Sequence, residues 1–180
     1  YAFYRRLGTR MSCDYLIESM SLHRVGVFTS PYIDPLVQTL DGGKTVTTGM
    51  ELYAREGCDY LVLQLRTSYR KKRLLGRALS HWIAASGFTK VVAVSSMSSH
   101  VQDDHDLGEG TPLRAFRSHN SFGLPSVDKK RIVGGGLLTR LDDDIPGLVC
   151  FAKGTDVEKI PLAKIMAEFL LRNVCGQAHG

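Results

Sequence analysis

The sequence predicts an α/β protein, built as a three-layer α/β/α sandwich with a largely parallel sheet. Three observations predict it: helical and strand-like segments alternate along the chain, the best strand-like segments are short apolar runs, and two of these runs are joined through a helix. The 180 residues are 43% hydrophobic and 23% charged, which is ordinary globular usage and excludes a disordered chain. At this length we expect one domain over residues 1–180.

The clearest unit is a strand, a helix and a second strand between residues 60 and 95. Tyr60–Leu65 and Lys90–Ser95 are apolar runs typical of strands that are buried on both faces. Between them an apolar stripe with helical spacing ends near Gly87; it comprises Leu74, Leu75, Ala78, Leu79, Trp82 and Ile83. This order predicts that the two strands are parallel and joined by a right-handed crossover.

Two further helices are predicted by apolar residues three and four positions apart. The first covers Cys13–Met20, with Thr9 or Ser12 as the cap of its first turn. The second covers Leu162–Leu170, with Pro161 in its first turn, where a missing N–H costs little. Both helices have one apolar face, so we expect them to cover the sheet.

Three more strands are expected, at Arg24–Phe28, Lys44–Thr48 and Gly147–Ala152. Residues 96–131 are polar and contain several Gly and Pro, so this region is predicted to be mostly loop, with a short helix near Leu113–Phe116. The stretch Leu137–Leu141 is also compatible with a short helix.

One short segment carries all the excess positive charge. Residues 66–77 hold six basic side chains and no acid, whereas the whole chain has a net charge of +5 (23 − 18). The six are Arg66, Arg70, Lys71, Lys72, Arg73 and Arg77. Such a local patch is compatible with a solvated loop and helix start, or with contact to an acidic protein partner. Nucleic-acid binders spread their positive surface more widely and interleave aromatics, so no nucleic-acid partner is expected.

The four cysteines, Cys13, Cys58, Cys150 and Cys175, are scattered and form no C-x-x-C pair. This spacing favours free thiols in a reducing compartment, and therefore a cytoplasmic or nuclear location. No apolar run reaches the roughly 18–20 residues that a membrane span needs, so no membrane partner is expected.

The chemical motifs all have structural alternatives. Gly134–Gly136 could bind a phosphate through its backbone N–H groups, but neither a G-x-G-x-x-G nor a P-loop pattern is present. The three glycines are equally explained by a sharp turn of the backbone. Ser95–His100 with Asp103, Asp104 or Asp106 would suggest a catalytic triad, but no G-x-S-x-G elbow accompanies it. The same acids could bind a metal ion together with His100 and His105, but the two histidines lack the H-x-x-x-H spacing of a helical metal site. We therefore expect no catalytic residue, cofactor or metal.

An enzyme is nevertheless the rival class of function. A phosphorylase-like or hydrolase-like domain would use Arg66 or Arg114 to hold an anion, the triple glycine as a phosphate turn, and Ser95 or His100 in the chemistry.

Four stretches, in this order, resemble the proteasome assembly chaperone family: Tyr60–Ser68, His81–Ser96, Thr111–Phe116 and Ile132–Thr139. The resemblance implies a non-enzymatic chaperone with a fold similar to that of nucleoside phosphorylases. It also implies a heterodimer with proteasome assembly chaperone 1 that binds α subunits and promotes α-ring assembly of the core proteasome. On this basis we expect residues 66–77 to contact an acidic surface of a proteasome subunit or of the sister chaperone.

Overall fold

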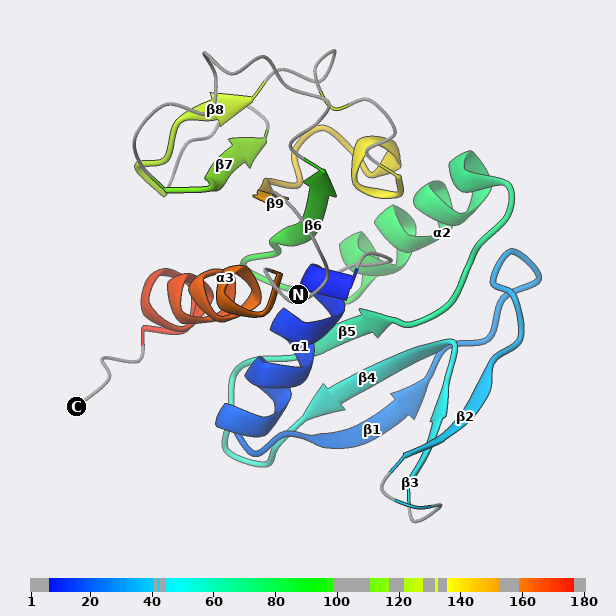
Figure 1. Cartoon of the computed structure of the whole chain (residues 1–180). Helices are drawn as coiled ribbons and strands as arrows, with labels where there is room; N and C mark the ends of the chain where they lie inside the picture. Colours follow the sequence, from blue (N-terminus) through cyan, green and yellow to red (C-terminus); the bar gives the residue numbers. More distant parts are fainter. Residues whose placement is uncertain are drawn as a thin grey trace.

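The computed structural model describes residues 7–40, 42, 45–98, 111–116, 122–127, 132, 136–152 and 159–176 (Figure 1). Its helical elements are α1 (Leu7–Ser19), α2 (Lys72–Ala85), the 3-10 turn η5 (Leu138–Arg140) and α3 (Lys159–Asn173). Its strands are β1 (His23–Val27), β2 (Val37–Leu40), β3 (Thr45–Thr48), β4 (Met50–Ala54), β5 (Val62–Leu65), β6 (Ala93–Ser98), β7 (Leu113–Phe116), β8 (Ser126–Val127) and β9 (Gly147–Ala152). The chain is thus a mixed α/β protein, as predicted.

The described strands form three ladders. β1, β4 and β5 make one sheet in that order, β2 and β3 make a hairpin, and the third sheet has the order β6-β9-β7-β8. Of the six pairings, only β6 with β9 and β7 with β8 are parallel. The expectation of a largely parallel sheet is therefore wrong for these strands.

The predicted strand–helix–strand unit exists as elements, but its two strands are not neighbours. β5 pairs antiparallel with β4, whereas β6 pairs in parallel with β9, which comes much later in the chain. Apolar runs show that a strand is buried on both faces, yet they carry no information about which strand lies beside it. The physical reason for the error is that partner choice is decided by contacts far apart in the sequence.

The buried side chains form two clusters that share the strands. The first combines α1 and α3 with strand residues, for example Leu16, Leu171 and Leu148. The second combines α2 and η5 with strand residues, for example Leu79 and Val149. Because consecutive residues of β9 enter different clusters, both of its faces are covered. Figure 1 shows α1 and α3 side by side, with α2 away from them beyond β5 and β6.

Three local predictions are corrected. Leu113–Phe116 is the strand β7 rather than a short helix, because it pairs with both β8 and β9. Thr9 and Ser12 lie inside α1, which extends back at least to Leu7, so neither caps its start. The segment before β3, in which no strand was predicted, contains β2 as the other half of the hairpin.

Gly76 is a position at which α2 packs closely against η5. A Cβ atom at this position would lie 2.5 Å from the carbonyl oxygen of Arg140. Real Cβ atoms do not approach backbone atoms so closely, so glycine permits this packing. The described helices fall short of the length and hydropathy that crossing a bilayer requires.

Candidate functional site

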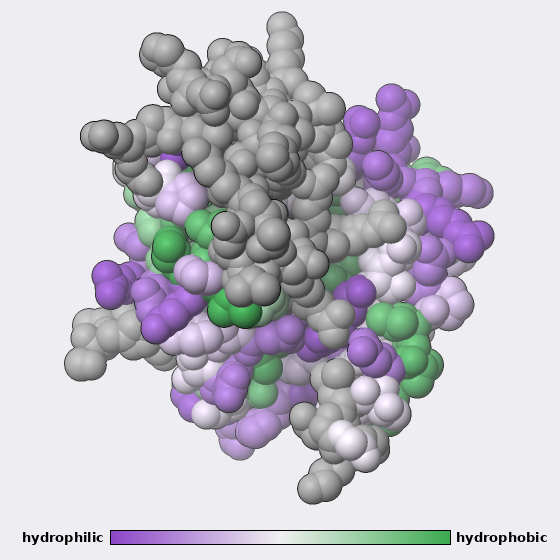
Figure 2. Space-filling view, in the orientation of Figure 1, coloured by the Kyte–Doolittle hydropathy of each residue, from purple (hydrophilic) through white to green (hydrophobic). Residues whose placement is uncertain are grey.

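The structure divides the basic segment into an exposed part and a buried residue. Arg70, Lys71, Lys72, Arg73 and Arg77 are exposed at the start of α2, and together they are called the basic surface below. Figure 2 shows hydrophilic residues gathered over this end of α2. Arg70 donates a hydrogen bond of 2.7 Å to Asp34, so one of the five cations already has a counter-ion.

The basic surface meets the N-terminal end of α2 without a compensating acid. Lys71 precedes the helix in the left-handed region at φ 45°, no side chain caps the first turn, and that turn contains no acidic residue. A helix N-terminus carries partial positive charge, so it repels the cations near it, and these cations also repel one another. An acidic group from outside would relieve this repulsion.

Arg66 has a different place and role. Its side chain is only 5% exposed, and its Nη2 atom lies 2.8 Å from Oδ1 of Asp14 on α1. Its Nε atom lies 3.4 Å from Oε2 of Glu51 on β4. Burial alone would lower the pKa of Arg66, but the Asp14 carboxylate and the Tyr53 hydroxyl raise it above its ordinary value. The guanidinium therefore stays charged inside the protein and is not part of the basic surface.

Glu51 is the centre of this buried network. Its side chain is fully buried and accepts hydrogen bonds from the Tyr53 hydroxyl (2.6 Å), from Nη1 of Arg24 (2.8 Å) and from the Thr48 N–H (2.9 Å). Burial alone would raise the pKa of Glu51, but these three hydrogen bonds together hold it below its ordinary value of 4.5. The network joins β1, β4 and the end of β5, and through Asp14 it also holds α1.

Sequence reasoning missed this network, although one signal was present. Glu51 lies within the otherwise mostly apolar β4, and Gln64 lies within the apolar β5, directly opposite it in the register. A lone polar residue in a buried strand requires a polar partner. Gln64 finds one in Asp14, to which it donates a hydrogen bond of 3.0 Å.

The residues of the rival enzyme interpretation are only partly described. Ser95 and Ser96 are buried in β6, and the Ser96 hydroxyl makes no hydrogen bond within the described part of the chain. Arg114 donates hydrogen bonds to the carbonyls of Thr111 (2.6 Å) and Leu113 (2.9 Å). Gly136 adopts φ 61°, which suits a turn.

The other candidates lie outside the described residues: His100, Asp103, Asp104, His105, Asp106, Gly134 and Gly135. No triad or phosphate turn is therefore assembled from the described residues. Among these residues, no three His, Cys, Asp or Glu side chains come together in a way that would hold a metal ion.

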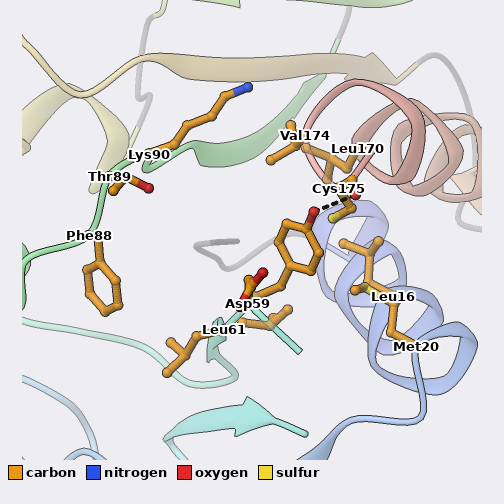
Figure 3. Close-up of a pocket in the computed structure, with 12 residues that line it drawn as sticks. Leu16, Met20, Asp59, Leu61, Phe88, Thr89, Lys90, Leu170, Val174 and Cys175 are labelled. Carbon is orange, nitrogen blue, oxygen red and sulfur yellow. Dashed lines mark hydrogen bonds between the residues drawn. The ribbon is translucent and has the colours of Figure 1, made fainter. Parts of the chain in front are cut away.

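A pocket of about 310 Å³ opens between α1, α3 and the segments 59–62 and 88–90 (Figure 3). Its apolar lining is contributed by all four parts of the chain and comprises Leu16, Met20, Leu61, Val62, Phe88, Leu170 and Val174. Leu16, Met20 and Leu170 are almost completely buried, so they form a floor. The polar residues Asp59, Thr89 and Lys90 are exposed and form the rim. This volume and lining are typical of small-molecule sites.

Tyr60 closes the α3 side of the pocket. Its hydroxyl donates a hydrogen bond of 2.5 Å to the carbonyl oxygen of Cys175, just beyond the end of α3. The dashed line in Figure 3 marks this bond, which ties together segments 115 residues apart. The aromatic ring is thereby held against the apolar wall. A second cavity, of about 400 Å³, shares Phe88, Thr89 and Lys90 with the first and is also lined by Asp142 and Asp144.

The sequence and the fold are both similar to those of known proteasome assembly chaperones. The family model described as "PAC2 family" matches residues 9–149. Proteasome assembly chaperone 2 of Danio rerio is 27% identical over 129 residues, which are 67% of this chain and 47% of the relative. Its counterpart in Bos taurus is 28% identical over 198 residues, covering 89% of this chain and 74% of the relative. The chain thus spans about half the length of the first relative.

Solved structures share the fold at low identity. Pyrococcus furiosus PbaA, an archaeal homolog of proteasome-assembly chaperone, aligns with a TM-score of 0.69 and 12% identity, covering 99% of this chain and 81% of PbaA. A Thermoplasma acidophilum protein of unknown function aligns with a TM-score of 0.69 and 20% identity, covering 97% of this chain and 74% of the other. The family model covers well over half of the sequence, so the chain belongs to the PAC2 family, whose matched members are proteasome assembly chaperones.

Proposed function

We propose that this chain acts as a non-catalytic chaperone in the assembly of the core proteasome. In this proposal it forms a heterodimer with proteasome assembly chaperone 1, binds α subunits and promotes formation of the α ring, in the cytoplasm and nucleus. The observation that carries the proposal is the family match over residues 9–149, supported by curated relatives that are all named Proteasome assembly chaperone 2. We also propose that the fold is a three-layer α/β/α sandwich related to that of nucleoside phosphorylases.

The basic surface is the proposed contact with an acidic region of an α subunit or of the sister chaperone. Within the described part of the chain, four of its five cations form no ion pair: Lys71, Lys72, Arg73 and Arg77. Their mutual repulsion at a helix N-terminus makes an acidic partner favourable. Contacts of this kind speed association more than they raise affinity, which suits a chaperone that must release its client.

The class of function is tested by recovering the chain from cell extract with its partners. We expect co-purification of proteasome α subunits and one related chaperone, identified by mass spectrometry. Recovery of neither, from an extract in which both are present, would contradict the proposal.

The basic surface is tested separately with purified partners. Lys72→Glu combined with Arg73→Glu should lower the association rate constant about tenfold at low salt and weaken its salt dependence. Acidic residues in the first turn favour α2, so the variant should fold normally. The matched control is Lys164→Glu with Arg172→Glu on α3, which changes the net charge by the same amount. Equal rates for the two variants would remove the basic surface from the proposal.

A further inference from the structure

The pocket between α1, α3 and residues 88–90 combines an apolar floor with one positioned cation. The floor residues Leu16, Met20 and Leu170 are 3–4% exposed, yet they line the space. An apolar group that enters it removes further apolar surface from water, which favours binding. The floor therefore selects for an apolar body.

The rim selects for charge. The ammonium group of Lys90 lies 3.5 Å from the carbonyl oxygen of Asn173 at the end of α3, and 5.8 Å from the centre of the Phe122 ring. Both contacts are with neutral groups, so neither supplies a counter-ion, and Figure 3 shows the Lys90 side chain extending from the 88–90 segment toward the end of α3 beside the pocket. Contacts that restrain a cation reduce the entropy that it loses when an anion binds.

Asp59 places a negative charge on the same rim, so the pocket could in principle bind either a cationic or an anionic ligand. A cationic amphiphile would use Asp59, and an anionic one would use Lys90. No hydrogen bond from the described residues fixes the Asp59 carboxylate, whereas two contacts position Lys90.

We propose that this pocket binds a small apolar carboxylate, with an unbranched chain of roughly six to ten carbons, for which a space of this size has room. The alkyl chain lies against Leu16, Met20 and Leu170, and the carboxylate meets Lys90. Tyr60 does not take part in recognition of the head group, because its hydroxyl is already bonded to Cys175. This site is independent of the proposed role in proteasome assembly.

The test is a titration of the intact chain with sodium octanoate, kept below the concentration at which it forms micelles, followed by methyl resonances in NMR. We expect saturable shifts at Leu16, Met20 and Leu170. Octanamide, which keeps the chain and loses the charge, should bind at least threefold more weakly, and octylamine should bind more weakly than octanoate. Absence of saturation by octanoate, or tighter binding of octylamine, would overturn the proposal.

Three exposed substitutions locate the site without disturbing the core. Lys90→Gln should weaken octanoate binding about three- to fivefold, as expected for a solvent-exposed ion pair. Asp59→Asn should strengthen it, because a repulsive charge is removed, and Thr89→Trp should block the mouth and abolish it. Lys164→Gln, on the exposed face of α3, is the matched control and should leave the affinity unchanged. Equal affinities for Lys90→Gln and Lys164→Gln would sink the proposal.

Discussion

The guanidinium of Arg66 lies 2.8 Å from the carboxylate of Asp14 and thereby joins the end of β5 to α1. Glu51 lies on its other side, so one buried cation is shared by an acid from the helix and an acid from the sheet. Arg66 is the first residue of the basic run 66–77 in the sequence, but its side chain is part of the protein interior.

Replacing Arg66 with Ala should destabilise the fold by roughly 3–5 kcal/mol, because Glu51 would remain buried with a partner removed. Arg70→Ala is the matched control, since Arg70 also pairs with an aspartate, Asp34, but is 77% exposed. Its cost should stay within about 1 kcal/mol. Urea unfolding followed by circular dichroism measures both values. Equal costs would show that the Arg66 network does not stabilise the fold.

The pH dependence of stability should reveal Glu51. Its pKa is lower in the folded protein than its ordinary value of 4.5, so the folded state binds this proton less readily than the unfolded state. The contribution of Glu51 is therefore complete above the unfolded value and is lost as the pH falls through the folded one. The free energy of unfolding of Glu51→Gln, compared with the unchanged chain, should show a cost that is constant between pH 6 and 7 and shrinks below about pH 4. A cost that is the same at pH 3 and pH 7 would contradict this.

Gly76→Ala offers a test in which two effects have opposite signs. At an exposed helical position this change stabilises a helix by about 1 kcal/mol. At Gly76 the new Cβ atom would meet the Arg140 carbonyl at 2.5 Å, so we expect a net destabilisation of about 1–3 kcal/mol from overpacking. His81→Ala on the exposed face of α2 serves as the control and should be nearly neutral. A rise in melting temperature for Gly76→Ala would show that α2 and η5 are not in close contact.

The four cysteines should separate into two reactivity classes. Burial raises the pKa of the Cys13 thiol to about 12, to which Asp14 adds, and burial alone raises the pKa of Cys150 to about 12. Neither forms an appreciable amount of thiolate at pH 8. Cys58 and Cys175 are only half-buried, so a thiol reagent at pH 8 should modify these two alone in the native protein and all four in denaturant. Burial also raises the pKa of Cys175, so Cys175 should react more slowly than Cys58. Peptide mapping of the modified sites checks this, and native modification of Cys13 or Cys150 would contradict it.

The elements with a strong local pattern were predictable. The buried strand β5, the helix α2 and the helix α3 agree with the predictions to within a few residues, because their apolar spacing and boundaries depend on neighbouring residues. The strand β9 also appears at its predicted bounds, Gly147–Ala152.

Features that depend on distant contacts were not predictable. β7 looks helical by itself and becomes a strand because β8 and β9 flank it. Arg66 belongs to the basic run by sequence, yet Asp14 and Glu51 draw it inside. The pocket is lined by four segments between Leu16 and Cys175, and no local pattern brings them together.

The position of β9 between β6 and β7 has a consequence for biosynthesis. β9 is made after both of its neighbours, and α1 packs against α3, which is made later still. During translation, β6 and β7 must therefore wait with unpaired edges until residues 147–152 leave the ribosome. A chain arranged in this way cannot complete this sheet until residues 147–152 have been made, and nascent products that stop before them would expose strands that invite aggregation.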